Sequence, residues 1–267
     1  LNGGGASSQE AAVAAWKQGF QTANADVTVN YDPVGSGGGR EQFIAGGLSF
    51  AGSDAFLEDE ELTKAGERCE GDVVSIPVYV SPIAVIYNLP GVENVQLSAA
   101  TIGGIFEGKI TTWDAAEIKA ENPDAKLPST KITPVHRADD SGTTKNFTNY
   151  LEAASGGSWS GGTVETWPTK GGEAAEGTSG LVAAVTSAEG AIGYADASQA
   201  GDLGKVSVKV GEEFVAPTEE AAAKVLDTAT PVSGRAATDI ALEIDRTTTE
   251  AGVYPVVLVS YQIACQT

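Results

Sequence analysis

His136–Thr144 reads HRADDSGTT and places an arginine, two carboxylates and three hydroxyl side chains within nine positions. It follows the strand-like run KITPV at 131–135 and precedes KNFTNYLEAA at 145–154, in which the apolar residues recur at helical spacing. The pattern predicts a strand, a polar turn and a helix, with Ser141-Gly142-Thr143 as the first helical turn. Units of this kind build α/β folds.

The chemistry of this turn suits an anion. The first N–H groups of a helix have no intrahelical partner and lie at the positive end of its dipole. Arg137 can add a forked pair of charged donors. Asp139 would repel an anion unless it holds the arginine or accepts a hydrogen bond from a protonated ligand. The plainer alternative is a helix N-cap with a surface salt bridge.

The same pattern recurs earlier in the chain. Ser7 and Ser8 lie in a glycine-hydroxyl turn that opens a helix, and Ser7 with Glu10 fits a capping box. Ser36 lies in a second glycine-rich turn, and Asp54 follows the short apolar run LSFAGS. The carboxyl ends of strands in α/β sheets are where ligands bind, although capping of the next helix would also explain Asp54.

Helices are predicted in three further places. Val13, Trp16 and Phe20 recur at helical spacing and predict a buried face on the first helix. Residues 219–226 and 236–244 also have helical patterns.

Composition bounds the classes of function. The 267 residues are 42% apolar, enough for one or two globular domains, and no apolar run reaches the length of a membrane span. The formal charge of −20 argues against nucleic acid or anionic lipid as a partner. Attraction of an anion must therefore come from local dipoles and hydrogen bonds. The one histidine, His136, and the cysteine spacing indicate no metal site, and no cofactor is expected.

Two long apolar runs, 78–89 and 253–264, predict buried strands that could cross between two lobes. We expect hinge strands near 77–87 and 253–264, a first lobe of 1–79 plus 254–267, and a second lobe of 80–253.

Cys69 and Cys265 are the only cysteines. A disulfide between them would join the last strand to the N-terminal part and indicate an oxidising, extracytoplasmic compartment. Two buried thiols are the alternative.

Several stretches occur in the order found in one known family. They are LNGGGASS (1–8), VGSGGGREQFIAG (34–46), FAGSDA (50–55), IPVYVSPIAVIYNLPG (76–91), IFEGKITTW (105–113), HRADDSGTT (136–144), EGAIGYAD (189–196) and YPVVLVSY (254–261). Together they resemble the extracytoplasmic phosphate-binding proteins that feed the Pst ABC transporter.

The resemblance implies an α/β, two-lobed type II periplasmic-binding-protein fold. Each lobe would be a mixed sheet flanked by helices, with hydrogen phosphate held between the lobes. It implies a monomeric, non-enzymatic receptor that delivers phosphate to a membrane permease. The positions that match the family's ligand shell are Ser7, Ser8, Ser36, Asp54, Arg137, Asp139, Ser141, Gly142 and Thr143.

The resemblance also assigns roles to the carboxylates. Asp54 would accept a hydrogen bond from the proton of hydrogen phosphate, and Asp139 would orient Arg137. Sulfate has no proton to donate near neutral pH, so an unpaired carboxylate facing it costs on the order of several kcal/mol. The family usually has an aromatic residue where Ser8 stands and uses its backbone N–H, which Ser8 retains.

The family commonly continues past the second crossing with helices that complete the first lobe, whereas this sequence ends at Thr267. We expect either a shortened chain or a reduced first lobe. The cysteine that anchors Gram-positive members to lipid would lie upstream of Leu1, so a lipid anchor is a hypothesis.

Three rival functions stay open at this stage. One is a receptor for another tetrahedral oxyanion, such as sulfate or arsenate. Another is a hydrolase or phosphatase that uses Ser141 with His136, although no third group is evident to orient the imidazole. The third is a surface phosphate sensor or adhesin with the same site and no permease.

Overall fold

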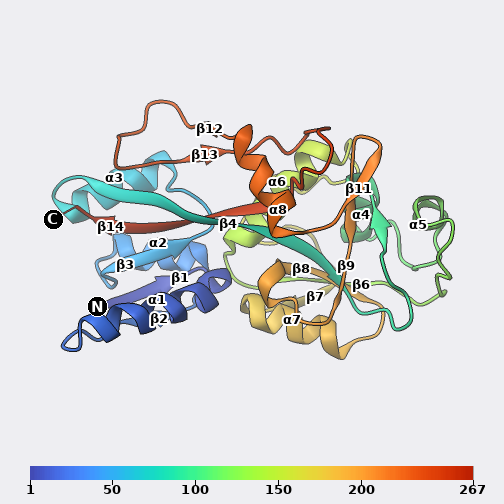
Figure 1. Ribbon diagram of the computed structural model, residues 1–267, viewed down its shortest axis with the longest axis horizontal. Helices are drawn as coiled ribbons and strands as arrows, with labels where there is room; N and C mark the ends of the chain where they lie inside the picture. The colour runs from blue at the N-terminus through green and yellow to red at the C-terminus, as the bar shows by residue number, and fades with distance from the viewer. Residues whose placement is uncertain (267) are drawn as a thin grey trace.

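The structure is a computed structural model that describes residues 1–266, and it is built on one twisted sheet of nine strands (Figure 1). The strand order is β2-β1-β3-β14-β4-β8-β6-β7, with β9 also paired to β4. The bounds are β1 Asn2–Gly5, β2 Asn30–Asp32, β3 Phe50–Ser53, β4 Val73–Tyr87, β6 Thr133–Arg137, β7 Glu173–Ala175, β8 Ala191–Asp196, β9 Gly204–Lys205 and β14 Val257–Cys265.

The long strand β4 belongs to both halves of the sheet. Residues 73–82 of β4 pair antiparallel with β14, whereas residues 83–87 pair with β8. We call the half with β1, β2, β3 and β14 the first lobe, and the half with β6, β7 and β8 the second lobe. In Figure 1, β4 and β14 run side by side along the long axis, which confirms the two predicted apolar strands.

Helices flank both lobes, as predicted for an α/β chain. Those next to the first-lobe strands are α1 Glu10–Ala23, α2 Ser36–Ile44 and α3 Asp59–Cys69, with the short 3-10 helix η1 at Ser7–Gln9. The others are α4 Ala99–Phe106, α5 Ala116–Glu121, α6 Gly142–Ala154, α7 Gly177–Ser187, α8 Glu219–Ala223, η2 Ala197–Gln199 and η3 Lys224–Asp227. Small sheets are formed by β5 Gln96–Leu97 with β10 Ser207–Val210 and β11 Glu213–Val215, and by β12 Thr230–Pro231 with β13 Leu242–Glu243.

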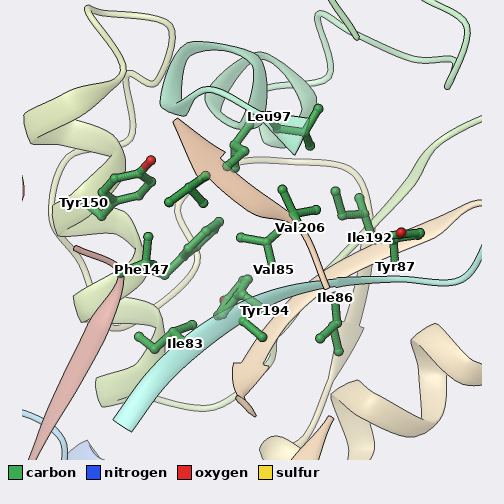
Figure 2. Packing of buried hydrophobic residues seen from close by; sticks show 14 of the residues in the cluster. Ile83, Val85, Ile86, Tyr87, Leu97, Phe147, Tyr150, Ile192, Tyr194 and Val206 are labelled. Carbon is green, nitrogen blue, oxygen red and sulfur yellow. The ribbon is translucent and has the colours of Figure 1, made fainter. Parts of the chain in front are cut away.

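Two separate buried clusters stabilise the halves. The larger lies in the second lobe, where Phe147 and Tyr150 of α6 pack toward Val85 of β4 and Tyr194 of β8 (Figure 2). The smaller lies in the first lobe and includes Phe43 of α2. Each lobe therefore buries its own apolar core, and the sheet joins them through β4.

The predicted disulfide is present. Cys69, at the end of α3, is bonded to Cys265, at the end of β14, with 5.3 Å between the Cα atoms. The bond spans 196 residues of sequence, so it ties the last strand to the first lobe. The alternative of two free thiols is wrong.

The predicted buried face of the first helix is wrong in part. Only Val13 of α1 is buried, while Trp16 and Phe20 are each 43% exposed. Helical spacing shows that a face is apolar, but it does not show what covers that face.

The helix predicted at 236–244 is also wrong. Ser75 of β4 donates through its N–H to the carbonyl of Thr238 and accepts from the N–H of Ile240. Asp239 is held by Arg235 at 2.9 Å, and Arg235 also donates to the carbonyl of Leu57. These tertiary contacts hold 235–240 against the first lobe as a turn at 237–238 followed by a single β-bridge between Asp239 and Ser75, and they override the local helical pattern.

Among the described residues, 1–266, no helix is both long and apolar enough to cross a membrane.

Candidate functional site

The first lobe contributes polar groups from three strand ends. Ser7 and Ser8 lie in η1 just after β1, Ser36 is the first residue of α2, and Asp54 follows β3. All four are buried, with at most 4% of each exposed. Ser36 Oγ accepts a hydrogen bond from the backbone N–H of Asp54 at 3.1 Å. The strand-turn-helix units therefore bring these four residues to one edge of the sheet, as the sequence predicted.

The predicted capping box at Ser7 is wrong. No side chain caps η1 or α1. Ser7 Oγ instead accepts from Arg137 Nη2 at 3.0 Å and from the backbone N–H of Thr178 at 2.9 Å. Its hydroxyl thus points into the space between the lobes, where it meets donors of the second lobe.

The second lobe contributes Arg137 and Asp139. Arg137 is the last residue of β6 and is 3% exposed. Its Nε donates to Asp139 Oδ1 at 2.7 Å, and its Nη2 forms a second bond to Asp139 Oδ2. Asp139 Oδ1 also accepts from the N–H of Gly177 at 3.0 Å. This bidentate grip fixes the plane of the guanidinium group.

The N-terminus of α6 completes the predicted set. Ser141 is the N-cap, and its hydroxyl accepts from the N–H of Thr144 at 3.1 Å. Thr143 Oγ1 donates across the lobes to Asp54 Oδ2 at 3.1 Å. A Cβ on Gly142 would lie 2.5 Å from Ser36 Oγ, so only glycine allows the lobes to approach this closely.

Asp54 is the acceptor at the centre of the site. Ser8 Oγ donates to Oδ2 at 2.5 Å and Ser260 Oγ donates to Oδ1 at 2.6 Å, in addition to the bond from Thr143. Burial raises the pKa of the Asp54 carboxyl, the hydroxyl donors lower it, and the net pKa stays above its ordinary value. The buried Asp54 carboxylate belongs to the first lobe, whereas the buried Arg137 guanidinium belongs to the second.

Sequence reasoning missed several residues of this site. Gly177 and Thr178 open α7 and give the site a fourth helix N-terminus. The glycine-hydroxyl pattern GTSG at 177–180 carried the same signal as the other turns. Gln199, whose Nε2 donates to the carbonyls of Ser7 and Ser8 at 3.2 and 2.9 Å, has no such signal.

The arrangement does not support nucleophilic catalysis by Ser141. The His136 ring stacks on Trp167 at 4.9 Å between centroids, and its Nδ1 lies 3.0 Å from the carbonyl oxygen of Arg137. The Ser141 hydroxyl is engaged as the N-cap. A base that activates a serine must share a hydrogen bond with it, and residues 1–266 contain no such bond between these two side chains.

Within residues 1–266, no three His, Cys, Asp or Glu side chains are grouped so that they could hold a metal ion. The chemistry of the site is that of fixed hydrogen-bond donors around the Asp54 carboxylate and the Arg137–Asp139 pair.

Known proteins resemble the chain over its whole length. The model of the PBP superfamily domain matches residues 1–267. The phosphate-binding protein PstS 3 of Mycobacterium tuberculosis (strain ATCC 25618 / H37Rv) is 35% identical over 271 residues, which cover 99% of this chain and 73% of that protein.

Solved structures show the same fold at lower identity. The high affinity periplasmic phosphate-binding protein PfluDING, bound with phosphate, superposes with a TM-score of 0.79 at 23% identity, covering 99% of this chain and 80% of that one. An ABC-type phosphate transport receptor from Vibrio cholerae gives 0.60 at 15% identity, covering 99% and 86%. The chain thus has the two-lobed type II binding-protein fold that its sequence motifs implied.

Proposed function

This chain belongs to the PstS phosphate-binding proteins of the PBP superfamily, and from that membership we propose that it captures inorganic phosphate as hydrogen phosphate. It acts as a receptor and not as an enzyme. The ligand lies between the lobes, among the polar groups that the two lobes present to each other.

One observation carries this proposal: a buried guanidinium of the second lobe and a buried carboxylate of the first are each hydrogen-bonded across the lobes. Arg137 Nη2 reaches Ser7 Oγ at 3.0 Å, and Thr143 Oγ1 reaches Asp54 Oδ2 at 3.1 Å. A cation and helix N-termini alone would suit any oxyanion. The carboxylate adds an acceptor, so the preferred ligand carries both negative charge and a proton.

The nine predicted residues divide into three roles. Backbone N–H groups at the helix starts and Arg137 donate to the phosphate oxygens, Asp54 accepts the phosphate proton, and Asp139 holds Arg137. The ligand-binding residues we propose are Ser7, Ser8, Ser36, Asp54, Arg137, Asp139, Ser141, Gly142 and Thr143. We add Gly177 and Thr178 as positioning residues, because their N–H groups donate to Asp139 and Ser7 and hold these side chains in place.

The lobe boundaries that we propose are 1–79 plus 254–266 for the first lobe and 80–253 for the second. Residue 267 lies outside the described residues. Two buried clusters support two lobes, and the larger one also takes in residues from 254–258, where β14 passes from the first lobe to the second. Residues 235–240, which belong by sequence to the second lobe, reach back to Ser75 of the first and act as a strap beside the hinge. Closure of the lobes buries the anion in a dry cleft, where each hydrogen bond is stronger.

We propose that the protein works outside the cytoplasmic membrane and delivers phosphate to an ABC-type permease. The Cys69–Cys265 disulfide supports an oxidising compartment. The relatives named above include a periplasmic phosphate-binding protein and an ABC-type phosphate transport receptor. An N-terminal lipid anchor upstream of Leu1 is part of the proposal. We expect a monomer that binds no nucleic acid, in keeping with the charge of −20.

Calorimetric titration of phosphate into ligand-stripped protein at neutral pH tests this function, with sulfate as the competing oxyanion. We expect binding of phosphate, no heat with sulfate, and loss of that preference in Asp54→Asn. Arsenate also carries a proton, so it should bind as well. Failure of the wild-type protein to bind phosphate, or equal binding of sulfate, would refute the proposal.

A further inference from the structure

Three buried side chains form a directional hydrogen-bond relay that ends on Asp54, on the side away from Ser8 and Thr143. Gln9 Nε2 donates to Ser260 Oγ at 2.9 Å, and Ser260 Oγ donates to Asp54 Oδ1 at 2.6 Å. Gln9 and Ser260 are both 0% exposed. Bulk solvent therefore does not reach this bond to the carboxylate.

The direction of the relay is fixed at its far end. Gln9 Nε2 also donates to the backbone carbonyl of Tyr261 at 2.9 Å, and Gln9 Oε1 accepts from Gln262 Nε2 at 2.6 Å. A carbonyl can only accept, so the Gln9 amide is held with its NH2 group toward Ser260. Since Ser260 Oγ already accepts from this amide, its single hydroxyl proton is directed to Asp54.

The strand pairing beside Ser260 is irregular. The pairing of β14 with β4 shifts between Ser260 and Tyr261, which pair with Tyr79 and Pro77, respectively. The extra residue is Val78 of β4, and Pro77 before it has no N–H to donate to the ladder, so the bulge belongs to β4 and not to the strand that carries Ser260. Bulges gather beside functional sites, and this one lies where the last strand passes Asp54.

We infer that Ser260, polarised by Gln9, is a positioning residue that keeps Asp54 an ionised acceptor and thereby sets the selectivity for a protonated oxyanion. The inference rests on the proposed function of Asp54. A protonated Asp54 would itself be a donor and could bind fully deprotonated sulfate. A proton on Oδ1 would leave the Ser260 hydroxyl proton facing another donor, so the relay disfavours that state.

Ser8 and Thr143 lower the pKa of Asp54 as Ser260 does, whereas burial and a neighbouring charge act in the opposite sense. Burial raises the pKa of the Asp54 carboxyl, and so does the negative charge of Asp196 from the second lobe. The phenols that face it, Tyr31 of β2 and Tyr79 of β4, have their own pKa values raised by burial and by Asp54, so they stay neutral. The Ser260 donor therefore opposes burial, and its removal should favour the protonated carboxyl.

The test compares Ser260→Ala with wild type and with Ser260→Thr, which keeps the hydroxyl. Infrared titration of ligand-free protein follows the protonated carboxyl band of Asp54, identified by its absence in Asp54→Asn. We expect the proton affinity of Asp54 to rise about tenfold or more in Ser260→Ala, and Ser260→Thr to stay near wild type. Gln9→Ala, which leaves the Ser260 hydroxyl free to rotate, should raise the proton affinity of Asp54 by a smaller factor.

Calorimetry supplies the second readout. Above the midpoint of that titration, sulfate affinity of Ser260→Ala should rise about tenfold while phosphate affinity does not rise. If Ser260 had a purely structural role, Ser260→Ala would bind phosphate and sulfate more weakly by similar factors. Either that result or an unchanged proton affinity of Asp54 would overturn the inference. Absence of phosphate binding in the wild type would refute the proposed function instead, and the infrared titration would still decide the role of Ser260.

Discussion

Glu165 grips Arg40 from the opposite lobe, with its two carboxylate oxygens 3.0 and 2.8 Å from Nη2 of the guanidinium group. Arg40 lies on α2. Its Nε also donates to Glu61 of α3 at 2.9 Å. Glu165 lies in the loop after α6, and Lys145 of that helix is 3.5 Å away. The Arg40 side chain is 5% exposed and that of Glu165 is 16% exposed, so water screens this pair only in part.

Glu165→Gln should weaken phosphate binding because the Arg40–Glu165 contact exists only when the lobes meet. Partial exposure limits the expected cost of closure to about 1 kcal/mol, which corresponds to roughly fivefold weaker binding. Calorimetry measures the affinity, and small-angle scattering measures how compact the phosphate-bound protein is. Glu117→Gln, which makes the same charge change on the exposed surface of α5, is the control. Equal affinities for the two variants would contradict a role of the pair in closure.

Gly142→Ala should impair binding far more than folding. The added Cβ would meet Ser36 Oγ at 2.5 Å and Asp54 Cβ at 2.8 Å, and both atoms belong to the other lobe. Overpacking costs roughly 1–3 kcal/mol, so phosphate affinity should fall by about 5- to 150-fold. Gly180→Ala on α7, whose Cβ meets nothing within 4 Å, should bind like wild type. If the free energy of unfolding of the ligand-free protein fell by as much as the free energy of phosphate binding, the clash would act on folding and not on closure.

Asp54→Asn should stabilise the ligand-free protein at neutral pH. Burial raises the folded-state pKa of Asp54, so the unfolded chain loses this proton first as pH rises. Wild-type stability therefore falls as pH rises from about 3.9 through the folded-state pKa, and the full cost is present above it. Asn carries no such cost. Denaturant unfolding at several pH values should show equal stabilities below about pH 3.9 and a growing advantage of the variant above it. A variant less stable than wild type at pH 7 would contradict this reading of the charge.

The site was predictable wherever one local pattern carries it. Turns rich in glycine and hydroxyl residues marked the positions of Ser7, Ser36 and the start of α6, because strand ends and helix starts are local features. Asp139 was predictable as the partner of Arg137 because the two are neighbours in sequence.

The remaining contacts depend on tertiary placement that no local pattern records. Ser260 approaches Asp54 across 206 residues, and Gln199 reaches Ser7 across 192. The strap at 235–240 is a further example, since its turn and bridge are held by backbone hydrogen bonds to Ser75 and do not follow from its own helical period. Local patterns thus predict which groups meet at the candidate site, while the residues that orient those groups become visible only in the fold.

The Cys69–Cys265 disulfide should contribute to stability without affecting the ligand. It closes a loop of 196 residues, and removal of such a bond typically costs about 2–4 kcal/mol, chiefly through the freedom gained by the unfolded chain. Ala264, beside Cys265, pairs with Phe50, at the end of β3 remote from Asp54. The double variant Cys69→Ser with Cys265→Ser should therefore unfold at lower denaturant concentration and bind phosphate within about twofold of wild type. A reductant should lower the stability of the wild-type protein toward that of the double variant and leave the double variant unchanged. If phosphate affinity fell with stability, the bond would be needed to hold β3 and β14 in register at the site, since Ser53 before Asp54 pairs with Tyr261 beside Ser260.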